Sequence, residues 1–170
     1  MNAAGRRLRL SLFGESHGAG VGCVLDGVPP GLAVDAARVQ ADLDARRPGG
    51  PLASPRQEPD RLQVLSGLQK GVATGAPLAL WIANEDARPQ DAQPHLLRPG
   101  HADLTQHAWS SGHADLRGGG HASGRLTAPL VAAGAVAQAL LDAHGIRCGA
   151  HLHEAGGVRG RSAPDAASMA

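Results

Sequence analysis

The sequence predicts an α+β fold, in which antiparallel strands and two helices occupy separate segments of a single domain. Two apolar runs, 6–12 and 21–28, flank a short glycine-rich connection, a pattern typical of two antiparallel strands. Two further runs, 62–65 and 76–83, also suit strands. A chain of 170 residues is the length of one domain, which we place at 1–170.

The first helix is expected between the second and third of these strands. Asp35 is a good N-cap, and Val39 and Leu43 fall on one face of the helix that follows. The Pro and Gly residues at 48–51 end it, and residues 50–59 read as a loop.

A second, longer helix is predicted over residues 128–144. Thr127 is its expected cap, Pro129 suits its first turn and Gly145 ends it. Its apolar stripe is expected to consist of Leu130, Ala133, Ala137, Leu140 and Leu141. Residues 147–153 suit a further strand, after which 156–170 carry no core signal. We therefore expect a truncated domain that leaves part of this stripe uncovered and is poorly stable alone.

Composition excludes several classes of function. A formal net charge of +1 gives no support for binding to nucleic acid or to an anionic membrane surface. Two distant cysteines, Cys23 and Cys148, predict neither a disulfide framework nor a zinc ribbon. The sequence shows no signal peptide and no apolar run of membrane-spanning length, so we expect a cytoplasmic protein.

Residues 84–124 lack apolar periodicity and are rich in Pro, Gly, His and Asp. An irregular stretch of this length in a compact domain is usually either functional or disordered. Because its residues are chemically specific rather than repetitive, we interpret it as functional.

The connection Gly14-Glu15-Ser16-His17-Gly18 is the first candidate site. His17 stands among small residues that leave space for a ligand above its ring, and an imidazole suits proton transfer at neutral pH. The alternative is an exposed turn histidine.

Residues 98–103 form the second candidate. Arg98 can fork onto a phosphate or carboxylate, His101 can exchange a proton, and Asp103 can fix the tautomer of a nearby imidazole. A solvated loop is the alternative.

Residues 117–125 lead directly into the second helix and form the third. Three glycines followed by Ser123 and Arg125 at a helix start are typical of an anion site, although a flexible linker remains an alternative. Arg46 and Arg47 end the first helix, where cations are also ordinary dipole partners.

Other familiar sites are missing or weak. The sequence contains no Gly-x-x-x-x-Gly-Lys-Ser/Thr phosphate loop. His151 and His153 could bind a metal in a small metal-binding domain, but no carboxylate or cysteine stands at ligand spacing, so we expect no metal. The residues alone thus indicate an arginine-rich anion site with acid–base histidines, and they do not name a reaction.

The order of the motifs is more informative than any one of them. The chain resembles the chorismate synthase family in these segments: Gly14–Gly18, Asp26–Leu32, Arg46–Gly49, Arg56–Asp60, Leu65–Gly67, Thr74–Pro77, Arg98–Asp103 and Arg117–Arg125. Each segment is short, but eight in one order over nearly the whole chain are a specific signal.

The resemblance implies a β-α-β sandwich, a homotetramer when the protein is full length, and a reaction. The family eliminates phosphate from 5-enolpyruvylshikimate 3-phosphate to give chorismate, with reduced FMN as cofactor and NADP associated with its supply. The resemblance also implies that His17 protonates or stabilises the reduced flavin and that His101 assists the departing phosphate. The groups implied to bind substrate or cofactor are Ser16, Arg46, Arg47, Arg98, Ser123 and Arg125.

The chain departs from the family pattern in places. Ala45 replaces the first of three arginines, and His121-Ala122-Ser123-Gly124-Arg125 replaces a common Arg-Ser-Ser-Ala-Arg. Family members also continue well past residue 170. We therefore expect an incomplete fragment of the enzyme, with a non-catalytic remnant that binds an anion or a partner chain as the alternative.

Overall fold

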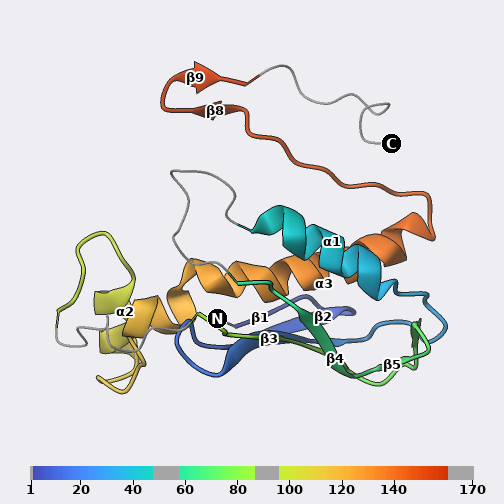
Figure 1. The fold of residues 1–170 in the computed structure, drawn as a ribbon, viewed down its shortest axis with the longest axis horizontal. Coiled ribbons are helices and arrows are strands. Elements are labelled where there is room, and N and C mark those ends of the chain that lie inside the picture. The colour runs from blue at the N-terminus through green and yellow to red at the C-terminus, as the bar shows by residue number, and fades with distance from the viewer. Residues whose placement is uncertain (1, 48–57, 87–95, 161–170) are drawn as a thin grey trace.

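A five-stranded antiparallel sheet with two helices on one face forms the body of the molecule (Figure 1). The structure is a computed structural model, and it describes residues 2–47, 58–86 and 96–160. The spatial order of the strands is β1-β2-β3-β7-β4. Their bounds are β1 Ala3–Ala4, β2 Arg9–Gly14, β3 Gly20–Asp26, β4 Leu62–Ser66 and β7 Leu78–Ala83. The predicted antiparallel pairing of the first two long runs is confirmed, with Leu12 opposite Cys23.

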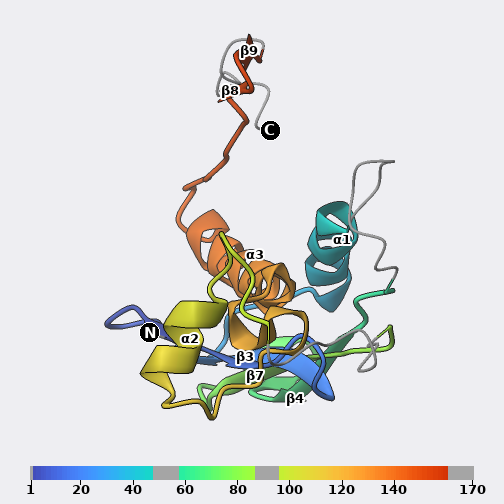
Figure 2. The ribbon, with the colours of Figure 1, turned by 90° about the vertical axis from the view of Figure 1, so that its left-hand side faces the viewer.

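The core lies between this sheet and helices α1 (Ala36–Arg46) and α3 (Thr127–Asp142). Alternate residues of β7 point into it, so Leu78, Leu80 and Ile82 are buried. Figure 2 shows both helices on the same side of the sheet. The α+β class is therefore confirmed, and the described residues supply one sheet and one helix layer of the predicted sandwich.

Helix α1 forms as its sequence predicts. The Asp35 carboxylate accepts a hydrogen bond from the backbone N–H of Ala37 at 2.8 Å, which satisfies one of the free donors at the helix start. Val39 and Leu43 are the buried residues of the helix.

The predicted apolar stripe of α3 is confirmed at Ala133 and wrong at Leu130. The buried residues are Ala128, Pro129, Ala132, Ala133, Ala135 and Val136, whereas Leu130 is 48% exposed. Most of these buried residues are alanines, and α3 packs against both α1 and β3. Gly145, at φ 69°, ends the helix as predicted.

The irregular stretch 84–124 contains a helix that sequence periodicity did not predict. Helix α2 spans Asp103–Trp109 and buries Asp103 among its residues, while Leu104 and Trp109 are exposed. Two 3-10 turns follow, η2 at Arg117–Ala122 and η3 at Gly124–Leu126. Because α2 has no apolar face on the core, it produces no periodic signal.

Two short hairpins complete the fold. Strands β5 (Leu68–Gln69) and β6 (Val72–Ala73) form one hairpin, and β8 (Glu154–Ala155) and β9 (Val158–Arg159) form another. The strand predicted at 147–153 is wrong, because the β8–β9 hairpin comes after it and stands away from the body (Figure 1). The predicted loop at 50–57 and the end of the chain after 160 lie outside the described residues.

The helical segment Gly124–Asp142 is long and apolar enough to cross a membrane, judged by length and composition alone. That combination also describes a core helix, and Ala128 and Ala132 are fully buried against the rest of the fold. We therefore interpret α3 as a core helix.

Candidate active site

The β2–β3 connection and the glycine-rich turn η2 meet at one end of the sheet. The backbone N–H of Ser16 donates to the carbonyl of Gly120 at 3.1 Å, and Nδ1 of His121 lies 3.0 Å from the carbonyl oxygen of Gly14. These contacts join two segments that are more than 100 residues apart in the sequence. The first and third candidate segments therefore form one structure.

Two consecutive glycines of η2 lie against the two predicted catalytic histidines. A Cβ on Gly118 would overlap the imidazole of His17, and one on Gly119 would lie 2.6 Å from Cε1 of His101. Both glycines have positive φ, 58° and 97°, which side chains rarely adopt. The structure thus brings His17 and His101 to the same turn, at a distance that only glycine permits.

Asp103 orients the ring of His101. Its buried carboxylate lies 2.6 Å from Nδ1 of His101 and accepts hydrogen bonds from Nε and Nη2 of Arg98 at 2.8 and 2.9 Å. The hydrogen bonds from Arg98 hold the pKa of Asp103 well below its usual range, against the opposing effect of burial. An ionised carboxylate only accepts, so Nδ1 of a neutral His101 carries the proton and Nε2 carries the lone pair.

His17 differs from His101 in its hydrogen bonding. Its Nδ1 is buried and has no hydrogen-bond partner among the described residues. Asp115 lies close by, and its pKa is lowered first by hydrogen bonds from Arg117 and to a lesser extent by the charge of His17. The Arg117–Asp115 pair is formed by Nη2 and Oδ2 at 2.6 Å. A buried nitrogen without a protein partner is a candidate contact for a ligand.

Arg125 is buried, with 6% of its surface exposed, and is held by two carboxylates. Its Nη2 lies 2.9 Å from Oε2 of Glu58, and its Nη1 is paired with Asp60. Its Nε donates to Oδ1 of Asn84 at 2.9 Å. The charge of Arg125 is therefore already compensated by Glu58 and Asp60.

The other predicted binding residues lie at different distances from the two histidines. Arg46 donates to Thr127 Oγ1 at 2.7 Å and pairs with Asp60 at 3.2 Å, so it lies beside Arg125. Arg47 is an exposed partner of Asp44, with 3.7 Å between Nε and Oδ1. Ser123 caps η3 by accepting from the backbone N–H of Arg125. No contact brings Arg47 to the site among the described residues.

Sequence reasoning missed three residues of this region: Glu58, Asp60 and Asn84. Each contacts Arg125, although they lie 41 to 67 positions away from it in the chain. The signal available was the pair of carboxylates in Glu58-Pro59-Asp60, because an arginine that becomes buried needs such partners. Asn84, directly after β7, gave no signal of its own.

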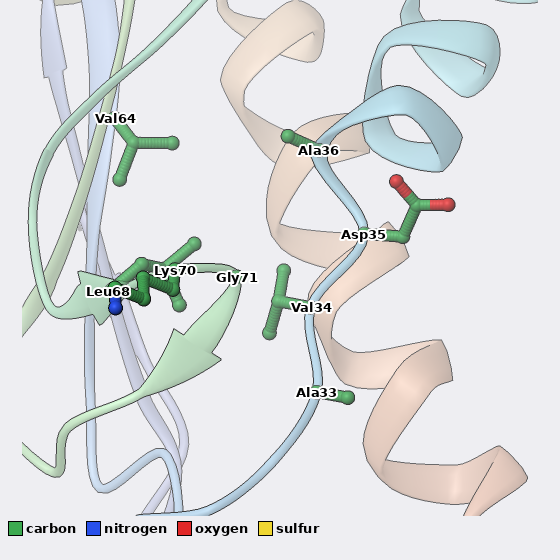
Figure 3. A pocket seen from close by; sticks show the side chains of 8 residues that line it. All are labelled: Ala33, Val34, Asp35, Ala36, Val64, Leu68, Lys70 and Gly71. Carbon is green, nitrogen blue, oxygen red and sulfur yellow. The ribbon is translucent and has the colours of Figure 1, made fainter.

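A separate hollow of about 620 Å³ lies between the start of α1 and the β5–β6 hairpin (Figure 3). Its lining is mostly apolar, with Asp35 and Lys70 as its charged members. Asp35 is used as a helix cap, which leaves Lys70 to meet an anion. The hollow therefore does not match a ligand with several negative charges, and it contains neither predicted histidine.

Comparison with known proteins identifies the family of this chain. A family model described as chorismate synthase matches residues 8–169. This chain belongs to the chorismate synthase family. It is 50% identical over 165 residues to a chorismate synthase of Aeropyrum pernix and 54% identical over 160 residues to one of Nitratidesulfovibrio vulgaris. These alignments cover 96% and 92% of this chain.

The chain spans less than half the length of these chorismate synthases, 43% and 45% respectively. A solved crystal structure of chorismate synthase superimposes with a TM-score of 0.63 at 31% identity, covering 84% of this chain and 36% of the other. The resemblance in sequence and the α+β fold are therefore confirmed together.

Proposed function

We propose that this chain carries the two acid–base histidines of a chorismate synthase, which eliminates phosphate from 5-enolpyruvylshikimate 3-phosphate. The observation that carries the proposal is the position of His17 and His101 against consecutive glycines of one turn. A single small ligand seated there would meet both rings. The family relationship supplies the substrate, its phosphate and the overall reaction.

His101 is proposed to act on the departing phosphate. Asp103 fixes the proton on Nδ1, so Nε2 is left to exchange a proton with a phosphate oxygen. Charge builds on that oxygen as the C–O bond breaks, and a proton or a nearby cation lowers the energy of this state. Arg98 is held beside the ring by Asp103 and adds a fixed positive charge.

The residues around His17 fit a flavin. Gly118 brings backbone close to the His17 ring, and the buried Nδ1 of His17 has no hydrogen-bond partner among the described residues. Reduced FMN, when bound, supplies electron density for the elimination, which no side chain can provide. His17 is proposed to hold or transfer a proton at its ring nitrogen beside the flavin, and Ser16 and Ser123 to bind phosphate or carboxylate groups.

A second candidate is a non-catalytic chain that binds an anion or a partner. Its support is the state of the arginines: Arg46, Arg47, Arg98 and Arg125 all pair with carboxylates, and the chain spans under half of its relatives. A cytoplasmic location and a homotetramer of the full-length protein remain proposals drawn from the family.

The test is an anaerobic assay of the purified chain with dithionite-reduced FMN and 5-enolpyruvylshikimate 3-phosphate. Chorismate release, lost in both His17→Gln and His101→Gln, is the expected result for an enzyme. Saturable binding of substrate and flavin without turnover would favour the second candidate. Absence of both binding and turnover in a cooperatively folded chain would contradict the proposal.

A further inference from the structure

We propose that Asn84 is a positioning residue that sets the shape of the turn carrying His17, and that Arg125 orients Asn84 for this task. The inference deepens the proposed function and rests on it for its catalytic meaning. Its structural basis is independent, because it concerns contacts within the chain.

One side chain holds most of the turn. Nδ2 of Asn84 donates to the carbonyl oxygens of Glu15, Ser16 and Gly18 at 2.9, 3.1 and 2.9 Å. The backbone N–H of Asn84 also donates to the carbonyl of Ala19 at 3.0 Å. An amide nitrogen has two hydrogens, so at least one is shared between carbonyls, and the three carbonyls must converge on one point.

Arg125 determines which way the side-chain amide of Asn84 faces. Oδ1 of Asn84 accepts from Nε of Arg125 at 2.9 Å, and a guanidinium only donates. The nitrogen of the amide must therefore face the turn. Arg125 is in turn fixed by ion pairs with Glu58 and Asp60. Its Nη2 also donates a hydrogen bond to the carbonyl of Ala83 at 3.1 Å.

The contacts of Asn84 also fix the backbone on both sides of His17. The carbonyls on both sides of His17, those of Ser16 and Gly18, accept hydrogen bonds from the same amide, and Gly118 packs against the ring. Without the amide, the carbonyls would no longer converge and the turn could open. Asn84 thus acts on the chemistry through His17 and need not touch a ligand itself.

The experiment uses the full chain with Asn84→Ala and compares it with Gln63→Ala, which removes an exposed amide from β4. The His17 imidazole is followed by NMR, with its signals assigned from His17→Gln, and its rate of modification by diethyl pyrocarbonate is measured by mass spectrometry. We expect the His17 signals to shift and the rate of its modification to rise about fivefold. This factor corresponds to the free energy of one net hydrogen bond that no longer holds the turn closed. The signals of exposed His144 should stay in place, and Gln63→Ala should change neither histidine.

Unchanged His17 signals and reactivity in a folded Asn84→Ala chain would overturn the proposal. If that variant fails to unfold cooperatively, Asn84→Ser, which keeps one donor, is measured in the same way. Loss of folding in both variants would show a general structural role and would also overturn it. Turnover is scored separately, so a chain without activity but with a displaced His17 contradicts the proposed function and leaves the positioning role supported.

Discussion

Gly118 lies directly against the imidazole of His17, with its backbone in the left-handed region at φ 58°. Its neighbour Gly119 stands in the same relation to His101. Local sequence rules classify a turn of three glycines as an anion site or a linker, and here two of the glycines pack against two imidazoles.

Substitution of Gly118 by alanine is expected to displace His17 and to lower stability. The positive φ alone costs about 1–2 kcal/mol for an L-residue, and the new Cβ would also overlap the ring. Gly124→Ala is the matched control, because Gly124 has no described atom within 4 Å of its Cβ position. Urea unfolding measures the free energy, and equal stability of the two variants would contradict this packing.

Asp103→Asn is expected to cost about 2–3 kcal/mol at pH 7, because it replaces a buried carboxylate that accepts from a guanidinium and an imidazole. The pKa of Asp103 is lower in the folded state than in the unfolded chain. Its contribution is therefore present above the unfolded value of about 3.9 and is lost as the pH falls towards the folded pKa.

The gap in unfolding free energy between parent and Asp103→Asn should thus narrow from pH 7 to pH 3. Asp44→Asn, on the exposed side of α1, serves as the control and should change stability by less than about 0.5 kcal/mol. A gap that stays constant over this range would contradict the assigned ionisation of Asp103.

Asp60→Asn is expected to destabilise the chain by about 3–5 kcal/mol, because it leaves the charges of Arg46 and Arg125 without a shared counter-ion. Asp26→Asn breaks the exposed pair with Arg9, whose side chains are 64% and 44% exposed, and should cost at most about 1 kcal/mol. Thermal and urea unfolding of both variants provide the comparison. Similar losses would show that burial at Asp60 is not the decisive factor.

The two cysteines should differ sharply in reactivity. Burial raises the pKa of Cys23 to about 12, so almost none of it is thiolate at pH 8, whereas Cys148 is exposed. Iodoacetamide should label Cys148 alone in the folded chain and both residues in 6 M guanidinium. Labelling of Cys23 at a comparable rate in the native chain would show that the β3 core opens readily.

Local features were predictable from sequence where a short pattern decides them. The Asp35 cap and the buried pair Val39 and Leu43 needed only neighbouring residues, and so α1 was predicted correctly. Helix α2 escaped prediction because it packs with a charged residue, Asp103, rather than with an apolar stripe.

The inward face of α3 was misjudged for a different reason. Its leucines are the more hydrophobic residues, yet the buried face of α3 is mostly alanine, and packing against α1 and β3 decides which face is buried. Likewise, the partners of Arg125 come from two distant segments, so its burial could not be deduced from the motif around it.

The central claim is that His17 and His101 face one shared ligand position. The most direct measurement is an anaerobic NMR titration of the 15N-histidine-labelled chain with 5-enolpyruvylshikimate 3-phosphate in the presence of reduced FMN. We predict that the imidazole signals of His17 and His101 move together, with the same dissociation constant, while those of His151 and His153 in the exposed tail do not. Movement with different constants, or of only one of the two rings, would contradict a shared site.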